Sequence, residues 1–561
     1  MSTTWKAAAI PSKVKFYHRT AALTQRFALV AAGLFLCANV HAAAPSDNLD
    51  RPPPRTIDDL TKLLDHYKPD PATAAQARAA AEQADPNTSD RQELFNFYVK
   101  RAQAAADLGR VSQQLQDFRK ATENISGNSK EEIQAYRDLS TAEVIGGNLL
   151  RSIQAAEIAA QRTDRKNLGQ ALGAYQQLAQ LYVLVGDFDK AREALRQAEA
   201  TFTALNSSKN WTYYSNNWSA NLERARGELF RAEGRFVEAE GAYRKGLRSL
   251  EAFLADLNGG VKPPNFSPYD RQRSERFREV LLRNIAQSLM GQGKNIDAEI
   301  SLRRALRFSL ERVGRNAPDT GTTLMLLSNC LGEQGRFADA ARLAEEAVRS
   351  FQQAGATPES LFMANARRAL ASTYVAQTRY KEALATFEQM QAGLNGDPVL
   401  AQKLANGDLD WVLALLRTGN ATAAETMARS MLDKAQRRNV SGSRLAEIRA
   451  FHGMALAASG QREAALDAFK QSIPKLIETR RSDEETGTGS VKRQQRLIAA
   501  IESYLNLLYE SAHSKPDTLA AAAAESFTLA DVARSSSVQQ ALTASAARAS
   551  ISDPALAELA R

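Results

Sequence analysis

Residues 172–198, LGAYQQLAQLYVLVGDFDKAREALRQA, contain the pattern that decides the fold. Two apolar helical stripes flank a break at Gly186, with a small side chain seven residues before the break, Ala179, and another five residues after it, Ala191. Two helices pack closely only where small side chains let their backbones approach. The stretch therefore predicts two antiparallel helices joined by a tight turn at Gly186.

The same unit recurs along the chain at intervals that mostly lie near 40 residues, which is the mark of a repeat protein. Its turn residues are Gly109, Gly147, Gly186, Gly234, Gly293, Gly335, Thr378, Gly419 and Gly460. The position five residues after the turn is alanine except at Gln114 and Ser152, and the position seven residues before it is small except at Val412. Helix pairs that each pack on the next build a solenoid. The sequence thus predicts an all-α repeat array.

These residues resemble the tetratricopeptide repeat, whose motif has small residues at positions 8, 20 and 27 and bulky ones at 11, 17 and 24. In the unit quoted above, those positions read Ala179, Ala191, Ala198, Tyr182, Phe188 and Leu195. The resemblance covers residues 93–480. It implies a right-handed superhelical solenoid of antiparallel helix pairs.

In that family the first helix of each pair lines the concave side, where positions 2, 5 and 9 face a bound peptide. In four repeats these positions read Asn221, Arg224, Glu228; Val280, Arg283, Gln287; Thr322, Met325, Asn329; and Asn365, Arg368, Ser372. The candidate binding residues are Arg224, Arg283, Gln287, Asn329, Asn365 and Arg368. Arginine suits carboxylates, and asparagine can bond both groups of a peptide backbone, so an extended, somewhat acidic peptide is expected. The alternative is that these side chains only keep long helices soluble.

The first 42 residues have the features of a secretory signal peptide. Five basic residues, Lys6, Lys13, Lys15, Arg19 and Arg26, precede an apolar run from Phe27 to Ala38, and Val40-His41-Ala42 suits cleavage after Ala42. The run is too short to span a bilayer, and no later stretch is long enough. We therefore expect a periplasmic or secreted protein without a membrane span, with a Pro-rich leader and N-terminal helices over residues 43–92.

The net charge of +9 falls to +4 when the five basic residues of the signal peptide are removed. Without a run of Lys or Arg, so small a charge argues against nucleic acid as a partner. Cleavage would also leave Cys330 as the last cysteine. It falls in an apolar helical pattern, so we expect a buried structural thiol.

Polar loops and a distinct C-terminal region are also predicted. Asn206–Trp218 and Asn258–Asp270 are expected to protrude as loops, and the aromatic residues of the first either form a binding patch or fold back onto the solenoid. The charged stretch Arg481–Arg493 should end the array, followed by an apolar-faced helix over Leu497–Ser511 and an Ala-rich pair over Leu519–Arg548. Residues 481–561 are thus expected to form C-terminal helices.

The final segment resembles the connector that follows the repeats in CHAT proteins, bacterial relatives of caspases. It reads ESFTLADVAR at residues 525–534, VQQAL at 538–542 and DPAL at 553–556. The resemblance implies a cysteine-peptidase domain whose His and Cys would have to lie beyond Arg561. The histidines are scattered and none lies near Cys330 in its repeat, so no activated thiolate is expected.

No phosphate-binding loop, metal-ligand spacing or complete catalytic constellation is found in the sequence. We therefore expect no enzyme activity and no metal or small-molecule cofactor. Two functions remain: an exported scaffold that binds a protein or peptide partner in its groove, or the substrate-recognition arm of a CHAT-type peptidase. A component of an envelope assembly is a third hypothesis. The partner's identity and the oligomeric state stay open.

Overall fold

The computed structural model describes residues 56–66, 71–164, 166–261, 263, 266–394, 408–437, 440, 442–486, 490–514, 517 and 519–533. The chain divides into two compact units, residues 1–51 and 52–561, and every described residue belongs to the second. The regular elements of the described residues are all helices, which confirms the all-α prediction. The predicted signal peptide, residues 1–42, lies outside the described residues, as does the Pro-rich stretch at 52–54.

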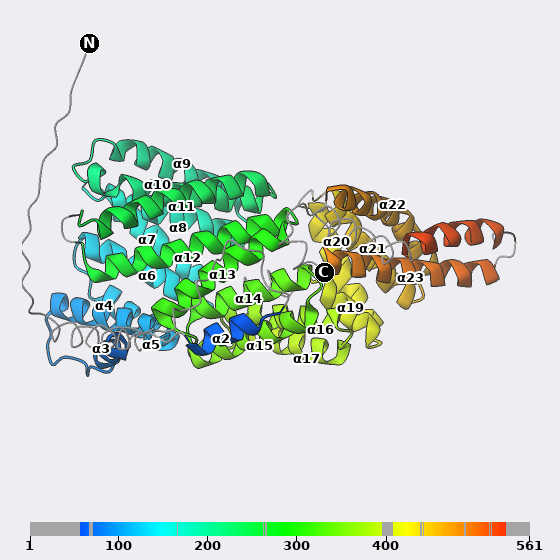
Figure 1. The fold of residues 1–561 in the computed structure, drawn as a ribbon, viewed down its shortest axis with the longest axis horizontal. Helices are drawn as coiled ribbons and strands as arrows, with labels where there is room; N and C mark the ends of the chain where they lie inside the picture. The colour runs from blue at the N-terminus through cyan, green and yellow to red at the C-terminus, as the bar shows by residue number, and fades with distance from the viewer. Residues whose placement is uncertain are drawn as a thin grey trace, which may run out of the picture. The chain divides into compact units, whose positions relative to one another are not determined.

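Helix pairs follow one another through most of the described residues (Figure 1). Two or three residues join the two helices of each pair. The pairs are α4 (Arg91–Asp107) and α5 (Val111–Glu123), α6 (Lys130–Ile145) and α7 (Leu149–Gln161), α8 (Leu168–Val185) and α9 (Phe188–Leu205), α10 (Trp211–Ala232) and α11 (Phe236–Asn258), α12 (Pro268–Gly291) and α13 (Asn295–Val313), α14 (Pro318–Glu333) and α15 (Phe337–Gln353), α16 (Leu361–Ala376) and α17 (Tyr380–Leu394), α19 (Leu409–Arg417) and α20 (Ala421–Arg437), and α21 (Gly442–Ala458) and α22 (Arg462–Thr486).

Every turn predicted between paired helices is present, and each turn residue has the left-handed backbone conformation. Eight of them are glycines with φ between 70° and 84°, while Thr378 has φ 61°. The residue that follows donates its backbone N–H to the carbonyl five positions earlier, as in Arg336 N to Leu331 O at 2.9 Å. This is the bond that closes a helix end in the Schellman motif. Glycine recurs because it adopts positive φ without steric cost.

The small residues predicted at the helix crossings are buried at the contact between paired helices. All seven alanines five residues after a turn, such as Ala191 and Ala340, are 0% exposed. In the repeat that turns at Gly335, Ser328 Oγ donates to the carbonyl of Ala340 at 2.7 Å, so the two positions meet across the pair. Where serine replaces alanine, Ser152 Oγ lies 3.0 Å from Ser140 Oγ and also donates to the Ser140 carbonyl. The crossings therefore stay close-packed in both cases.

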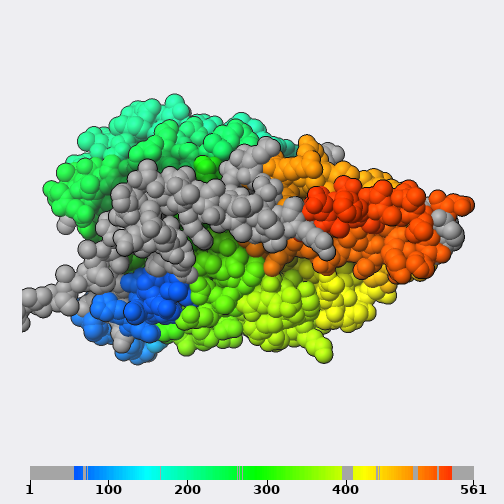
Figure 2. Space-filling view, turned by 45° about the vertical axis from the view of Figure 1, so that its right-hand side comes forward, coloured from blue at the N-terminus to red at the C-terminus, as the bar shows by residue number. Residues whose placement is uncertain are grey.

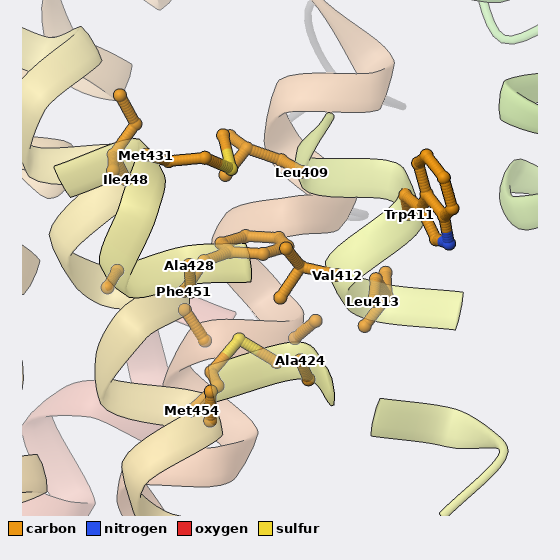
Figure 3. Packing of buried hydrophobic residues seen from close by; sticks show 14 of the residues in the cluster. Leu409, Trp411, Val412, Leu413, Ala424, Ala428, Met431, Ile448, Phe451 and Met454 are labelled. Carbon is orange, nitrogen blue, oxygen red and sulfur yellow. The ribbon is translucent and has the colours of Figure 1, made fainter. Parts of the chain in front are cut away.

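Apolar residues from successive pairs merge into long cores. One cluster extends from α16 through α23, and Figure 3 shows its centre, where Phe451 and Val412 lie near Ala424 and Ala428. Trp411 in the same cluster stacks on Phe387, with ring centroids 5.0 Å apart. The predicted buried thiol, Cys330, is 0% exposed in a second cluster, which includes residues of α10 to α15. None of the described helices is long and apolar enough to cross a membrane.

Two further helices precede the array. α2 (Asp58–His66) packs on α13 through Leu60 and Leu64, which join the second cluster, and its Asp65 pairs with Arg315 at 2.8 Å. α3 (Pro71–Ala81) packs on α4. In Figure 2 the blue residues of this region lie against the green residues of the array. The N-terminal segment thus covers the first helix of the array with α3 and a helix of its fifth pair with α2.

The prediction of two long polar loops is wrong in part. The residues from Trp211 onward belong to α10, and Asn258 still belongs to α11. Trp218 is 8% exposed and stacks on Tyr214 with ring centroids 5.6 Å apart, while Tyr213 is 36% exposed. The interpretation that these rings fold back onto the solenoid is therefore confirmed for Trp218. These residues form a helix and not a loop because the helix brings the aromatic rings together in one buried cluster.

The C-terminal region is more regular than the charged sequence suggested. α22 continues to Thr486 and α23 begins at Val491, so most of the predicted break at Arg481–Arg493 is helical. The expected helix Leu497–Ser511 lies within α23 (Val491–Ser514), whose Leu497, Ile501 and Tyr504 are buried against the array. Residues 519–533 are helical, and the rest of the predicted Ala-rich pair lies outside the described residues.

Candidate functional site

A cavity of about 1440 Å³ lies on the side of the array formed by the first helices of its early pairs. Positions 2, 5 and 9 of three consecutive first helices all line it. These residues are Gln134, Arg137 and Thr141 of α6, Gly173, Gln176 and Gln180 of α8, and Asn221, Arg224 and Glu228 of α10. The cavity is therefore the inner face that the repeat register predicts, and its lining is rich in carboxamides and arginines.

Residues distant in sequence bound this cavity on its other side. The turns of the first two pairs lie against the segments that flank α14 and α16. Gln272 Nε2 donates to Asp107 Oδ1 at 2.9 Å, and Val111 N donates to the Ala354 carbonyl at 3.4 Å. A Cβ on Gly147 would lie 2.6 Å from the carbonyl oxygen of Glu359, so only glycine fits there. Burial at this contact raises the pKa of Asp107.

Of the six candidate residues, Arg224 is the one that lines this cavity. Its side chain is 23% exposed and lines the cavity. Among the described residues, its Nε has no hydrogen-bond partner, and the nearest carboxylate oxygen, on Glu228, is 4.0 Å away. The ring of Phe277 lies 5.6 Å from the guanidinium carbon. Burial lowers the pKa of Arg224, so its positive charge is only partly compensated.

Glu228 does not neutralise Arg224 because other donors already satisfy it. It accepts hydrogen bonds from Arg231 at 2.7 Å, Asn284 at 2.9 Å and Gln180 at 3.3 Å. The bond from Gln180 also fixes the register of α8 on α10, because both helices are first helices and run parallel. Gln176 lies one turn before Gln180 on α8, and Arg224 lies one turn before Glu228 on α10. Gln176 and Arg224 are therefore at the same height along the two parallel helices.

Gln176 is 3% exposed, lines the cavity, and its Nε2 has no hydrogen-bond partner among the described residues. Leaving a buried amide donor unpaired costs free energy, so such a group is ready to bond a ligand acceptor. Gln176 was missed as a candidate, although position 5 of the quoted repeat identifies it. The three candidate positions of α6 were missed in the same way.

Arg283 was predicted to bind a ligand, but the structure pairs its guanidinium with acidic side chains of the protein itself. The residue is 6% exposed and does not line the cavity. Its guanidinium lies 3.4 Å from Asp319 Oδ1 and 4.0 Å from Glu279 Oε2, and it donates to Thr323 Oγ1 at 3.3 Å. Position 5 of α12 thus supports the packing of α12 on α14.

The other four candidates do not line this cavity either. Gln287 is half-buried and accepts a hydrogen bond from Arg231 at 3.5 Å, while Asn329 and Asn365 are half-buried on α14 and α16. Arg368 is 43% exposed in its side chain and lies 3.9 Å from Asp408. The structure therefore gathers Arg224 with residues of α6 and α8, and leaves the candidates of α14 and α16 in a separate part of the array.

No group of three or more His, Cys, Asp and Glu side chains that could hold a metal ion is present within the described ranges. The resemblance to CHAT connectors concerns residues 525–556, of which the structure describes only 525–533. It stays a prediction, as does the absence of catalysis and of a cofactor.

Comparison with known proteins agrees with this architecture. A family model described as tetratricopeptide repeat matches residues 277–353, and a second model of the same description matches residues 172–200. The second match covers almost the same residues as the unit quoted at the outset. No curated protein matches the chain.

Several solved structures are similar to the chain at low identity. A Rap protein in complex with competence and sporulation factor is 12% identical, with a TM-score of 0.46, and the match covers 73% of this chain and 99% of that one. Aspartyl phosphate phosphatase F from Bacillus subtilis is 13% identical, with a TM-score of 0.39 and coverage of 73% and 95%. BtubC from P. vanneervenii is 17% identical, with a TM-score of 0.32 and coverage of 46% and 92%. All three TM-scores are below 0.5, so no functional argument rests on them.

Proposed function

Since the chain is a tetratricopeptide-repeat protein, we propose that it binds an extended segment of another polypeptide in the cavity lined by α6, α8 and α10. Arrays of this kind use their concave surface for binding. The observation that carries the proposal is the set of nine positions, three on each helix, that line one cavity of about 1440 Å³. A volume of this order accommodates several residues of an extended chain.

Side-chain amides suit this task because each offers both a donor and an acceptor. Gln134, Gln176, Gln180 and Asn221 form a ladder of amides along the cavity, on three successive first helices. Three of them already donate one hydrogen bond within the protein, Gln134 to Asp138, Gln180 to Glu228 and Asn221 to Asn217, and each amide has a second N–H. A peptide backbone presents N–H and C=O groups at regular intervals, so such a ladder can hold it without requiring one sequence. Specificity then comes from the charged groups of the lining.

Arg224 favours an acidic side chain or a terminal carboxylate on the ligand. A guanidinium makes charge-assisted hydrogen bonds that are about twice as strong as neutral ones. Gln176 Nε2, one helix away at the same level, adds a second donor that has no partner in the described part of the chain. The expected ligand is thus an extended peptide with a carboxylate placed at this pair.

The test uses a phage-displayed library of random unstructured peptides selected on the full chain. Peptides selected by the natural sequence should bind the double variant Arg224→Ala, Gln176→Ala about 10-fold to 100-fold more weakly, since hydrogen bonds to charged groups contribute about 1.5–3 kcal/mol. Arg196→Ala is the matched control, because Arg196 is 66% exposed on α9 and pairs with Glu193 on the same helix. Equal affinity of the double variant and the natural sequence would remove the cavity as the binding site.

We also propose that binding takes place in the periplasm or outside the cell. The support is the sequence of residues 1–42, with its basic start, apolar run and Val40-His41-Ala42. Expression of the complete chain in a Gram-negative host, followed by fractionation and N-terminal sequencing, tests the proposal. A soluble periplasmic product that starts at Ala43 is expected, and a cytoplasmic product that retains residues 1–42 would contradict export.

A further inference from the structure

The inner face of the later repeats is covered by the beginning of α23. Residues from four successive first helices contact residues 490–496, which comprise Ser490 and the first turns of α23: Glu333 of α14, Ser372 of α16, Asp410 of α19 and Glu447 of α21. Ser372 is position 9 of its repeat, one of the positions expected to face a ligand, and Glu447 is position 2. The first turns of α23 therefore lie where the repeat register places a bound segment.

Two basic side chains of α23, four residues apart and so on one helical face, enter this surface. Lys492 is 6% exposed and its Nζ lies 3.2 Å from Ser372 Oγ. Arg496 bonds Glu447 at 2.6 Å and Asp410 at 3.3 Å. Burial lowers the pKa of Arg496, but the two carboxylates offset this and hold that pKa above its ordinary value. Arg496 is thus bound by two carboxylates of the array, and Lys492 by a hydroxyl.

The array side of this surface is acidic, and α23 supplies cations to it. The array contributes four carboxylates, from Glu333, Asp408, Asp410 and Glu447. Two of them have arginine partners within the array, because Arg368 lies 3.9 Å from Asp408 and Arg444 lies 3.0 Å from Glu447. Glu333 and Asp410 have no arginine of the array within 4.0 Å in the described part of the chain, and Arg496 of α23 pairs with Asp410 at 3.3 Å. The charge of Arg493, also on α23, helps to lower the pKa of Glu447. Uncompensated buried carboxylates are costly, so without α23 this acidic surface would attract another source of positive charge.

The shape of the surface also fits a lysine side chain. A Cβ built on Gly332 of α14 would lie 2.6 Å from Cε and 2.9 Å from Nζ of Lys492. Gly332 therefore leaves room for the stem of Lys492. One turn further, the position of a Cβ on Gly335 is 3.3 Å from Val491. The two glycines let the first turn of α23 lie directly on α14.

We propose that the first helices of the later repeats form an acidic groove for a basic helix, and that residues 490–496 of this chain are its resident occupant. This groove is separate from the cavity of the proposed function and prefers ligands of the opposite charge. A partner helix with Lys or Arg residues four apart displaces the start of α23, while the apolar residues from Leu497 onward keep α23 attached to the array.

The test uses the full chain with Lys492→Glu and Arg496→Glu, and a fluorescent synthetic peptide of residues 490–496 as the probe. We expect the peptide to bind this variant at least about 10-fold more tightly than the natural chain, because truncating one partner of a buried charge pair strongly weakens its contact. A peptide with glutamate at both positions should not bind. Arg462→Glu is the control, because Arg462 pairs with Glu510 at an exposed site away from the groove. A folded variant that binds no better than the natural chain would overturn the proposal.

If the charge reversals prevent folding, a second pair of variants, Gly332→Leu and Gly241→Leu, tests the same proposal. Gly332→Leu fills the space of the Lys492 stem, whereas Gly241→Leu places the same residue in α11 where a Cβ meets nothing within 4 Å. Hydrogen exchange of residues 491–497 should be at least about 10-fold faster in Gly332→Leu than in Gly241→Leu, with residues 500–508 unchanged in both. Unchanged exchange at 491–497, or a uniform increase along α23, would show a fixed structural helix instead of a displaceable occupant.

Discussion

Gly227→Ala is expected to destabilise the helix pair that positions Arg224, although alanine is the better helix former. Gly227 lies seven residues before the turn at Gly234, at the crossing of α10 and α11. A Cβ there would lie 2.6 to 2.8 Å from three ring atoms of Tyr243, which is 0% exposed. The ring has no solvent space into which it can move. Overpacking of this kind costs about 1–3 kcal/mol.

The matched change is Gly241→Ala, on the exposed side of α11, where a Cβ meets nothing within 4 Å. Both substitutions gain about 0.5–1 kcal/mol from the lower backbone entropy of the unfolded chain. That gain cancels in the comparison, so Gly227→Ala should be less stable than Gly241→Ala by about 1–3 kcal/mol. Native-state hydrogen exchange at the amides of α10 and α11 measures the difference. If the two variants protect these amides equally, close approach at the crossings does not limit this fold.

Three further predictions concern individual side chains. Thr378→Gly should raise the free energy of unfolding by about 1 kcal/mol, because Thr378 holds a positive φ of 61° that glycine adopts freely; lower stability would argue against strain at this turn. Burial raises the pKa of the Cys330 thiol to about 12, so with Cys37→Ser also present we expect no reaction with a thiol reagent at pH 8 until denaturant is added, and fast reaction of the folded chain would contradict burial. Burial raises the pKa of Tyr214 to about 12, against about 10 when unfolded, so its contribution to stability is present below pH 10 and is lost as the pH rises from 10 to 12. Burial also raises the pKa of Tyr182, Tyr243 and Tyr504, so Tyr214→Phe should reduce that step in the pH dependence of unfolding without abolishing it. A step of unchanged size would contradict a contribution from Tyr214.

The architecture could be predicted because the repeat encodes its geometry locally. A turn residue fixes the positive φ, and small residues at fixed distances from it fix the crossing, so both signals lie within 13 residues of sequence. Even the repeat with a weak motif, which turns at Gly147, follows the rule, because Ser140 and Ser152 are small enough to meet. Backbone sterics act at each turn independently of the rest of the chain. This is why the prediction is correct along the whole array.

The start of α10 was predicted as a loop because its composition was given more weight than its spacing. Asparagine and serine residues around Trp211 favour turns. However, Trp211, Tyr214 and Trp218 stand at i, i+3 and i+7, which places the three rings on one helical face. Trp211 and Trp218 have ring centroids 6.1 Å apart in the structure. The helical signal was therefore present in the sequence.

Whether a side chain on the inner face lines the cavity or pairs within the protein could not be predicted in the same way, because it depends on residues from other repeats. Position 5 is an arginine in both α10 and α12, yet Arg224 lines the cavity while Arg283 is paired with Asp319, which begins the next pair. Local sequence specifies only the face on which each arginine lies. Whether its charge is free follows from the acid that the neighbouring helix brings beside it.

The contact of α23 with the later repeats could not be predicted from local sequence either, because the residues that meet are even farther apart in the chain. Lys492 meets Ser372, 120 residues earlier, and Ser490 meets Glu333, 157 residues earlier. No periodic pattern connects such residues, and Lys492 lies in a stretch that composition alone predicts to be solvated. Nevertheless, buried carboxylates are stable only with nearby cations. Asp410 and Glu447 therefore required basic partners, but nothing in their own repeats says that Arg496 of α23, 86 and 49 positions later, supplies them.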